Sequence, residues 1–169
     1  RVNSVYGTAT LSYANKIFLD VTGRNDWSST LPSGNNSFFY PSVSTSFILS
    51  DLLRLPEQIS FAKLRASWAQ VGNDTDPYKT AKYYNTSAFP GSASVSPTLY
   101  NARFKPEISN SIEVGLDWRM FKQRFGLDLA FYNNITRNQI LDVPMDQTTG
   151  YTKATMNSGK VRNRGIELQ

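Results

Sequence analysis

Charged side chains in this sequence recur at every second position, with apolar side chains between them. Asp20, Arg24 and Asp26 follow this spacing, and so do Lys63 and Arg65. Alternate residues of a β-strand share one face, so these charges are predicted to form a polar surface. Carboxylates and guanidinium groups on such a surface can make charge-assisted hydrogen bonds to a solute, to another part of the protein or to one another.

We interpret the whole set of alternating charges as candidates for such contacts. For any single residue, mutual pairing across neighbouring strands is the simpler interpretation. Two of the carboxylates could form a glycosidase-like pair, but no pocket is predicted around them, and no enzyme is expected. The set comprises Asp20, Arg24, Asp26, Lys63, Arg65, Glu113, Asp117, Arg119 and Asp128, with Glu167 near the chain end.

Several chemistries are excluded by composition, because the 169 residues contain neither cysteine nor histidine. Disulfides, the usual zinc, copper and haem ligand sets, and a Ser-His-Asp triad cannot be assembled. We expect no cofactor. The net charge is +5, yet most Lys and Arg residues are scattered singly. That scatter does not predict a nucleic-acid-binding surface.

One short acidic segment has oxygen ligands at alternate positions, as calcium loops do. It runs from Asn73 to Asp76. It lacks the glycine and the distal glutamate of an EF-hand, and an Asx-type turn at a strand end is the preferred interpretation. No metal site is expected here.

The polar surface requires strands, and the pattern predicts seven, with no long amphipathic helix. A helical turn is expected only within about 51–58. Short and long connections alternate along the chain, so all the long ones fall at one end of the sheet. The expected strands cover about 5–13, 17–27, 38–49, 61–71, 111–120 and 125–132, with a seventh after Gly159.

Strand length and loop asymmetry favour a membrane barrel over a soluble sheet. A tilted strand crosses a bilayer in about 9–11 residues, and membrane barrels combine short periplasmic turns with long extracellular loops. Over the first six predicted strands, the predicted apolar face carries no charge. Aromatic belts are expected at both rims, at the short-turn rim from Tyr13, Phe18, Phe47, Trp118, Phe121 and Phe125, and at the long-loop rim from Trp27, Phe38, Phe39 and Tyr40. The alternative is a soluble β-sandwich that binds glycans, because alternation alone describes both folds.

Four sequence strings carry a more specific signal. They are Tyr40-Pro-Ser-Val-Ser44, Lys63-Leu-Arg-Ala-Ser-Trp-Ala-Gln-Val-Gly-Asn73, Lys105-Pro-Glu107 with Ser111-Ile-Glu-Val-Gly-Leu-Asp117, and Asn157-Ser-Gly-Lys-Val-Arg-Asn-Arg-Gly-Ile-Glu-Leu168. In this order and spacing the chain resembles the SusC/RagA-type TonB-linked transporters of the bacterial outer membrane, in the later half of their barrel.

The resemblance implies an all-β, antiparallel, up-and-down transmembrane β-barrel of about 22 strands with a plugged lumen. Residues 1–169 would then be part of one barrel domain, without the plug or the TonB-contacting segment. The implied function is import of oligosaccharides or peptides, and the alternating charges are then candidates to line the solute path or to hold the plug. A SusD-like surface lipoprotein lid and the TonB complex are the implied partners. The chain begins at Arg1 and ends within an alternating segment, so we expect a piece of a longer protein.

Two further groups of side chains are binding candidates. Aromatic residues in the long loop at about 72–110 are expected to contact solute or lid, because a loop this long is usually functional or disordered and aromatics disfavour disorder. The basic residues near the chain end share the parity of Ile166, so in a regular strand they would face lipopolysaccharide at the outer rim. A bulge at Gly165 would reverse this parity. The candidates are Tyr78, Tyr83, Tyr84, Phe89 and Tyr100, and Lys160, Arg162 and Arg164.

Overall fold

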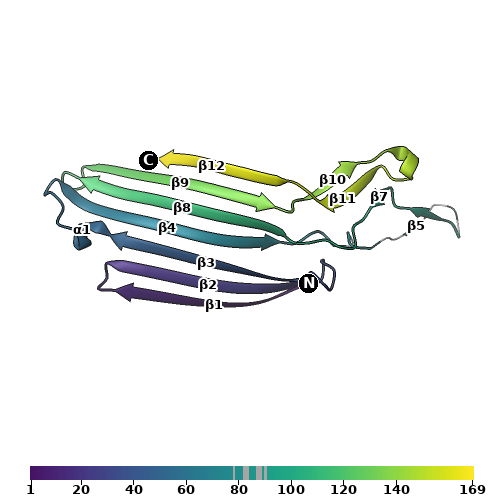
Figure 1. The fold of residues 1–169 in the computed structure, drawn as a ribbon, viewed down its shortest axis with the longest axis horizontal. Helices are drawn as coiled ribbons and strands as arrows, with labels where there is room; N and C mark the ends of the chain where they lie inside the picture. Colours follow the sequence, from purple (N-terminus) through teal and green to yellow (C-terminus); the bar gives the residue numbers. More distant parts are fainter. Residues whose placement is uncertain (78, 82–83, 87–88, 90) are drawn as a thin grey trace.

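The chain folds around one seven-stranded antiparallel sheet, drawn in Figure 1 as a single layer. The structure is a computed structural model that describes residues 1–77, 79–81, 84–86, 89 and 91–169. Each strand of the sheet pairs with the next one along the chain, in the order β1-β2-β3-β4-β8-β9-β12. This confirms the predicted up-and-down antiparallel sheet. The strands are β1 Val2–Tyr13, β2 Ile17–Ser28, β3 Ser37–Ile48, β4 Ile59–Asn73, β8 Glu107–Met120, β9 Phe125–Arg137 and β12 Lys160–Leu168.

Most strands are longer than predicted. The longest, β4, has 15 residues, and its register shifts between Ile59 and Phe61. The predicted boundaries were too narrow because they followed the apolar alternation. The strands continue past it into polar residues, where backbone pairing alone extends the ladder.

The three connections at one end of the sheet are 14–16, 49–58 and 121–124, and the three at the other end are 29–36, 74–106 and 138–159 (Figure 1). The two longest connections lie at the predicted end. The connection between β3 and β4 is longer than that between β2 and β3, so the predicted alternation of short and long is wrong there. Ala14 and Asn15 adopt φ values of 51° and 55° between β1 and β2. Positive φ at both central residues matches the tight turn that suits the twist of antiparallel strands. A four-residue helix, α1 (Leu49–Leu52), begins the connection between β3 and β4.

The long connections contain strands that the sequence did not predict. β10 (Ile140–Pro144) pairs with β11 (Lys153–Asn157), and β7 (Thr98–Leu99) joins β11 in parallel. A short hairpin of β5 (Tyr84–Thr86) and β6 (Ala93–Val95) precedes them, and a 3-10 turn, η1 (Gln147–Thr149), lies between β10 and β11. These pieces have two to five residues each. Pairing across long stretches of chain stabilises them, and local periodicity cannot reveal such pairing.

The sheet has an apolar face and a polar face, and its register keeps them separate from strand to strand. On the apolar face, Leu19 lies opposite Thr45, Ala66 lies opposite Val114, and Val114 lies opposite Phe131. Val114 and Phe131 are 41% and 44% exposed. In the part of the chain that the structure describes, no second sheet or helix covers this face (Figure 1). A β-sandwich would bury it, so the single layer argues against the soluble alternative.

Among the described residues, none of the helices has the length and apolar character needed to span a lipid bilayer.

Candidate functional site on the polar face and long loops

The structure places all ten predicted solute-lining charges, including Glu167, on the polar face. Register brings them into rows: Asp20 lies in the same row as Glu113, and Lys63 lies opposite Asp117, which lies opposite Asp128. Strand alternation alone explains this common orientation, because each charge is an even number of residues from the next charge on its strand.

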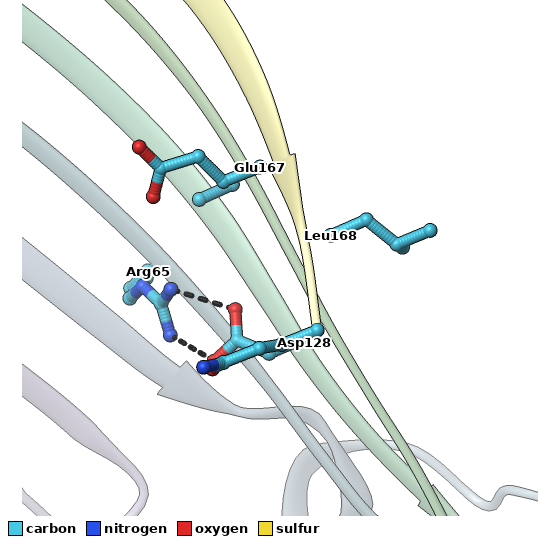
Figure 2. A pocket seen from close by; sticks show the side chains of 6 residues that line it. Arg65, Asp128, Glu167 and Leu168 are labelled. Atoms are coloured by element: carbon cyan, nitrogen blue, oxygen red, sulfur yellow. Dashed lines mark hydrogen bonds and ion pairs between the residues drawn. The ribbon is translucent and has the colours of Figure 1, made fainter.

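Arg65 is the centre of the polar face. Its Nη1 and Nη2 donate to the Asp128 Oδ2 and Oδ1 atoms over 2.9 and 2.8 Å, a bidentate pair shown in Figure 2. Its Nε lies 3.9 Å from a Glu113 carboxylate oxygen. Arg65 belongs to β4 and Asp128 to β9, so the side chain crosses the whole of β8 to reach its partner. Gly115 of β8 makes the crossing possible, because a Cβ there would overlap the Arg65 side chain.

The expected pairing of charges across neighbouring strands occurs between Arg65 and Glu113, at 3.9 Å, but the closest carboxylate partners of these arginines lie elsewhere. Besides the Arg65 pair across an intervening strand, two pairs run along a single strand. Arg24 Nε donates to Asp26 over 2.8 Å, and Arg119 donates to Asp117 over 3.2 Å. Residues two apart on a strand share a face, and long arginine side chains can turn back along it. The carboxylates of Asp117 and Asp128 therefore each have an arginine partner.

Shallow hollows surround Arg65 on the polar face. Three of them, of about 320, 270 and 370 Å³, include this side chain in their lining. Glu113 lines two of the three, and Glu167 lines two. All three walls include carboxylate groups, and serine or asparagine side chains contribute to the second and third. Such a surface can offer hydrogen bonds to a polar solute or to an inserted protein segment.

We expect Gly115→Ala to displace the Arg65 side chain and to lower the free energy of unfolding by about 1 kcal/mol, the upper range for a partly exposed ion pair. Urea titration of the whole refolded protein measures this loss. The control is Gly126→Ala, on the polar face of β9, where an added Cβ meets nothing within 4 Å. Equal stability of the two variants would show that the Arg65 contact contributes nothing.

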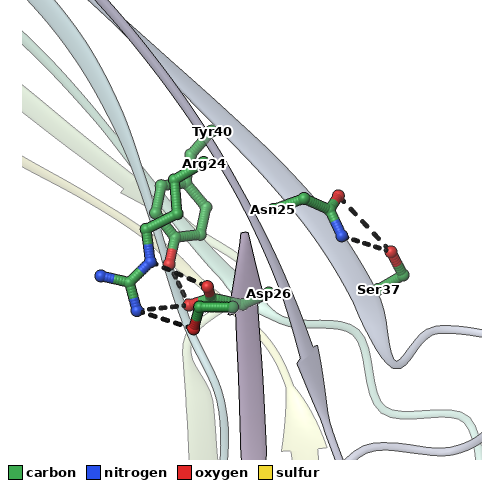
Figure 3. A network of polar contacts seen from close by, with 6 residues as sticks. Arg24, Asn25, Asp26, Ser37 and Tyr40 are labelled. Atoms are coloured by element: carbon green, nitrogen blue, oxygen red, sulfur yellow. Dashed lines mark hydrogen bonds and ion pairs between the residues drawn. The ribbon is translucent and has the colours of Figure 1, made fainter. Parts of the chain in front are cut away.

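A second polar network lies near the long-loop end (Figure 3). The Tyr40 hydroxyl donates to Asp26, which also accepts from Arg24, and Arg24 donates to Ser4 over 3.1 Å. Phe38 stacks on Tyr40 with ring centroids 5.8 Å apart. Phe38 and Tyr40 were predicted to belong, with Phe39, to the aromatic belt at the long-loop rim, and this prediction is wrong for Phe38 and Tyr40. Of these three residues only Phe39 is on the apolar face, because alternate residues of β3 point to opposite sides. Phe18, predicted for the belt at the short-turn rim, is also on the polar face, opposite Ser46.

The loop aromatics fall into three groups. Tyr84 and Phe89 are 73% and 78% exposed. Tyr100 lines a hollow of about 240 Å³ with Leu99 and Asn101 on one side and residues 154–156 of β11 on the other. Tyr78 and Tyr83 lie outside the described residues. Tyr84 and Phe89 are therefore largely exposed, and Tyr100 helps to join two loops.

Specific contacts hold the long loops together as one unit. Phe104 is fully buried, and its carbonyl accepts from Asn35 Nδ2 over 3.2 Å. Asn157 bonds both backbone groups of Lys105, at 2.8 Å each. Phe104 is one of the aromatics of the predicted long loop, and Asn157 begins the fourth sequence string, but neither the burial of Phe104 nor the backbone bonds of Asn157 was predicted. An aromatic in a polar loop was the only available signal for Phe104, and it does not distinguish a buried ring from an exposed one.

A charged cluster stiffens the outer hairpin formed by β10 and β11. Asp142 accepts from Lys153 Nζ over 2.7 Å and from Thr155 Oγ1 over 2.6 Å. The Lys153 and Thr155 hydrogen bonds hold the pKa of the Asp142 carboxyl below its ordinary value. A depressed carboxyl pKa stabilises the folded hairpin at neutral pH, and this contribution is lost on acidification through that pKa.

The acidic segment Asn73–Asp76 joins neighbouring loops through its side chains. Asp74 Oδ2 accepts from Ser28 Oγ over 2.5 Å and from Thr30 Oγ1 over 3.0 Å. Asp76 forms an ion pair with Lys79 over 2.7 Å. Within the described residues no cluster of three potential metal-ligating His, Cys, Asp or Glu side chains occurs. The Asp74 contacts join this strand end to the loop after β2.

β12 pairs with β9 in unbroken register across Gly165. Lys160, Arg162 and Arg164 therefore share the apolar face of Ile166. The Tyr132 ring lies over Gly165 on the polar face, where a Cβ would come within 2.6 Å of its hydroxyl.

Comparisons with known proteins agree with this geometry. Residues 1–169 match a family model described as TonB dependent receptor-like, beta-barrel. The chain is similar to TonB-dependent receptor P26 of Formosa agariphila, with 31% identity over 177 residues that cover 99% of this chain and 18% of that protein. It is also similar to TonB-dependent receptor P3 of the same organism, at 29% identity, 98% of this chain and 17% of that protein. The chain thus spans less than a fifth of these relatives.

Solved structures show the same fold. A chain in the structure of the RagAB peptide transporter superposes with a TM-score of 0.88 at 23% identity, over 99% of this chain and 19% of that one. The siderophore receptor PirA from Pseudomonas aeruginosa superposes with a TM-score of 0.69 at 17% identity, over 99% of this chain and 30% of that one.

Proposed function

Because this chain belongs to the TonB-dependent receptor β-barrel family of the bacterial outer membrane, we propose that it forms barrel wall and extracellular loops of an importer of oligosaccharides or peptides. The carrying observation is the two-faced sheet, matched over its whole length by the family model. The apolar face meets lipid and the polar face lines the lumen. Family membership makes this a receptor segment rather than an enzyme.

The SusC/RagA type is the subtype we propose within this family. The higher TM-score against the RagAB chain, 0.88, than against PirA, 0.69, supports it. RagAB is a peptide transporter, and we extend the proposed solute class to oligosaccharides on the strength of the sequence strings alone. Growth of a strain lacking the whole receptor, on a panel of complex glycans and peptides, tests both classes. Unimpaired growth on every member of the panel would contradict import of either.

Partners follow from the same proposal. A SusD-like surface lipoprotein is the proposed lid over the long loops, where Tyr84 and Phe89 are exposed. The TonB complex would power import through parts of the receptor outside these 169 residues. Inside the lumen, the hollows around Arg65 are the proposed contact surface for solute or plug.

The loop aromatics provide a direct test. We expect Tyr83→Ala with Tyr84→Ala to weaken ligand capture or lid affinity by roughly tenfold, the scale of a buried aromatic contact in an interface. Barrel assembly should be intact, because Tyr84 is 73% exposed. Binding to the purified receptor and uptake by cells are the measurements.

Tyr13→Ala is the matched control, since this ring is also 73% exposed but lies at the short-turn end of the sheet. It should change neither capture nor lid affinity. If uptake and lid affinity of the Tyr83/Tyr84 double variant equal those of the parent, these rings are not the contact.

A further inference from the structure

The charges on the apolar face have one sign and one location. Over the seven strands of the described sheet, the charged residues whose parity places them on this face are Arg137, Lys160, Arg162 and Arg164. All four are exposed cations at the long-loop end of β9 and β12. The polar face, in contrast, carries both signs. We call these four residues the basic seam.

The four cations of the basic seam repel one another unless an external anion neutralises them. Lys160 lies directly opposite Arg137 in the ladder between β12 and β9. Like charges directly opposite each other destabilise an antiparallel pair. The carboxylates of the seven described strands all have the parity of the polar face, so strand alternation turns them away from the seam. The neutralising anion must come from outside the sheet.

One arginine of the basic seam is already oriented by the protein. Arg162 Nε donates to Asn133 Oδ1 over 2.7 Å, across the seam. This bond uses one N–H of the guanidinium, whose two Nη groups carry four more donors. A planar donor fork of this kind suits bidentate binding of a phosphate.

The surroundings of the basic seam identify the anion. Directly along the same face follow the apolar side chains of Ile166, Leu168 and Phe131, which are 71%, 69% and 44% exposed. In a family of outer-membrane barrels this band meets hydrocarbon, so the cations lie where the hydrocarbon ends, on the long-loop side. We propose that the basic seam binds the phosphate groups of outer-leaflet lipopolysaccharide. Arg137 was not among the cations predicted from the sequence for this role.

This inference rests on family membership and on the register of β9 and β12, and it is independent of which solute is imported. A soluble phosphate would have no reason to prefer a site flush with the lipid-facing band. An acidic partner protein is the alternative ligand of the basic seam, and the experiment distinguishes it from lipopolysaccharide.

The test uses the whole receptor that carries this segment, purified in detergent and titrated with phosphorylated lipid A under native mass spectrometry. Arg162→Gln with Arg164→Gln should weaken lipid A binding by about thirtyfold, because each cation near an anionic lipid surface contributes roughly a factor of five. The control, Arg54→Gln with Lys122→Gln, removes two exposed cations at the short-turn end and should leave binding unchanged.

Three further arms decide the outcome. Arg162→Lys with Arg164→Lys keeps the charge but loses the planar donor fork, so its binding should lie between that of the parent and that of the glutamine variant, which separates lost charge from altered folding. Dephosphorylated lipid A should bind the parent about as weakly as phosphorylated lipid A binds the glutamine variant. Inorganic phosphate at the same concentration should not compete. Equal affinity of parent and glutamine variant for phosphorylated lipid A would overturn the proposal, and so would co-purification of an acidic protein that only the parent retains in place of lipid.

Discussion

Val114→Arg is expected to prevent most of the receptor from assembling in the outer membrane. Val114 lies near the middle of β8, between Ala66 and Phe131 on the apolar face. A charge at the midplane of the lipid-facing surface of a barrel costs about 2–4 kcal/mol. That is a large fraction of the 5–15 kcal/mol by which typical domains are stable, to order of magnitude. The folded fraction, seen as heat-modifiable mobility on a gel, measures the effect.

Ser67→Arg is the matched control for this substitution. Ser67 lies next to Ala66 on β4 and opposite Glu113, so it is at the same height but on the polar face. An arginine there meets a carboxylate-bearing surface and should be tolerated. Equal assembly of the two variants would show that the apolar face does not contact hydrocarbon, and the membrane assignment of this face would then be wrong.

Phe104→Ala is expected to open the unit formed by the long loops. The ring is fully buried, and removal of a buried aromatic costs about 3–5 kcal/mol. The transmembrane sheet does not depend on this ring, so the loss should be local. Hydrogen exchange should rise in 29–36, 96–106 and 138–159, while exchange in β8 and β9 is unchanged.

Phe89→Ala serves as the control for the loop substitution, because that ring is 78% exposed and its removal leaves no internal cavity. It should not alter exchange in the three segments. If Phe104→Ala left exchange in β7 and β11 at the parent level, the loops would not be coupled through this residue. Loss of the whole barrel would show instead that the coupling extends into the sheet.

The long loops were the least predictable part of the fold. β7 joins β11 across more than fifty residues of chain, in a parallel pairing of Thr98 with Lys153 and Leu99 with Ala154. Neither segment has a local pattern that requires this partner. Asn157 illustrates the same limit, because an asparagine in a loop gives no indication that it will bond the backbone of Lys105.

The same limit applies to the charges of the polar face, because their orientation could be predicted from the sequence and their partners could not. That Arg65 and Asp128 point to one side follows from strand parity, which the sequence contains. That they bond each other across β8 depends on the register of three strands and on the missing Cβ of Gly115. From the sequence alone, partners on neighbouring strands were predicted, because strand order is the only indication of which side chains lie close together.

The sequence by itself determined the seven strands of the main sheet, the end at which the two longest loops lie, and the alternation of side chains between the two faces. These are local properties, since side chains alternate with a period of two and short turns dictate antiparallel neighbours. Only the tertiary structure decided which residues are in contact. Examples are the Arg65–Asp128 pair, the stack of Phe38 on Tyr40, and the position of Lys160 opposite Arg137. The physical reason is that contacts across strands depend on relative register, which is set by backbone hydrogen bonds between segments far apart in the chain.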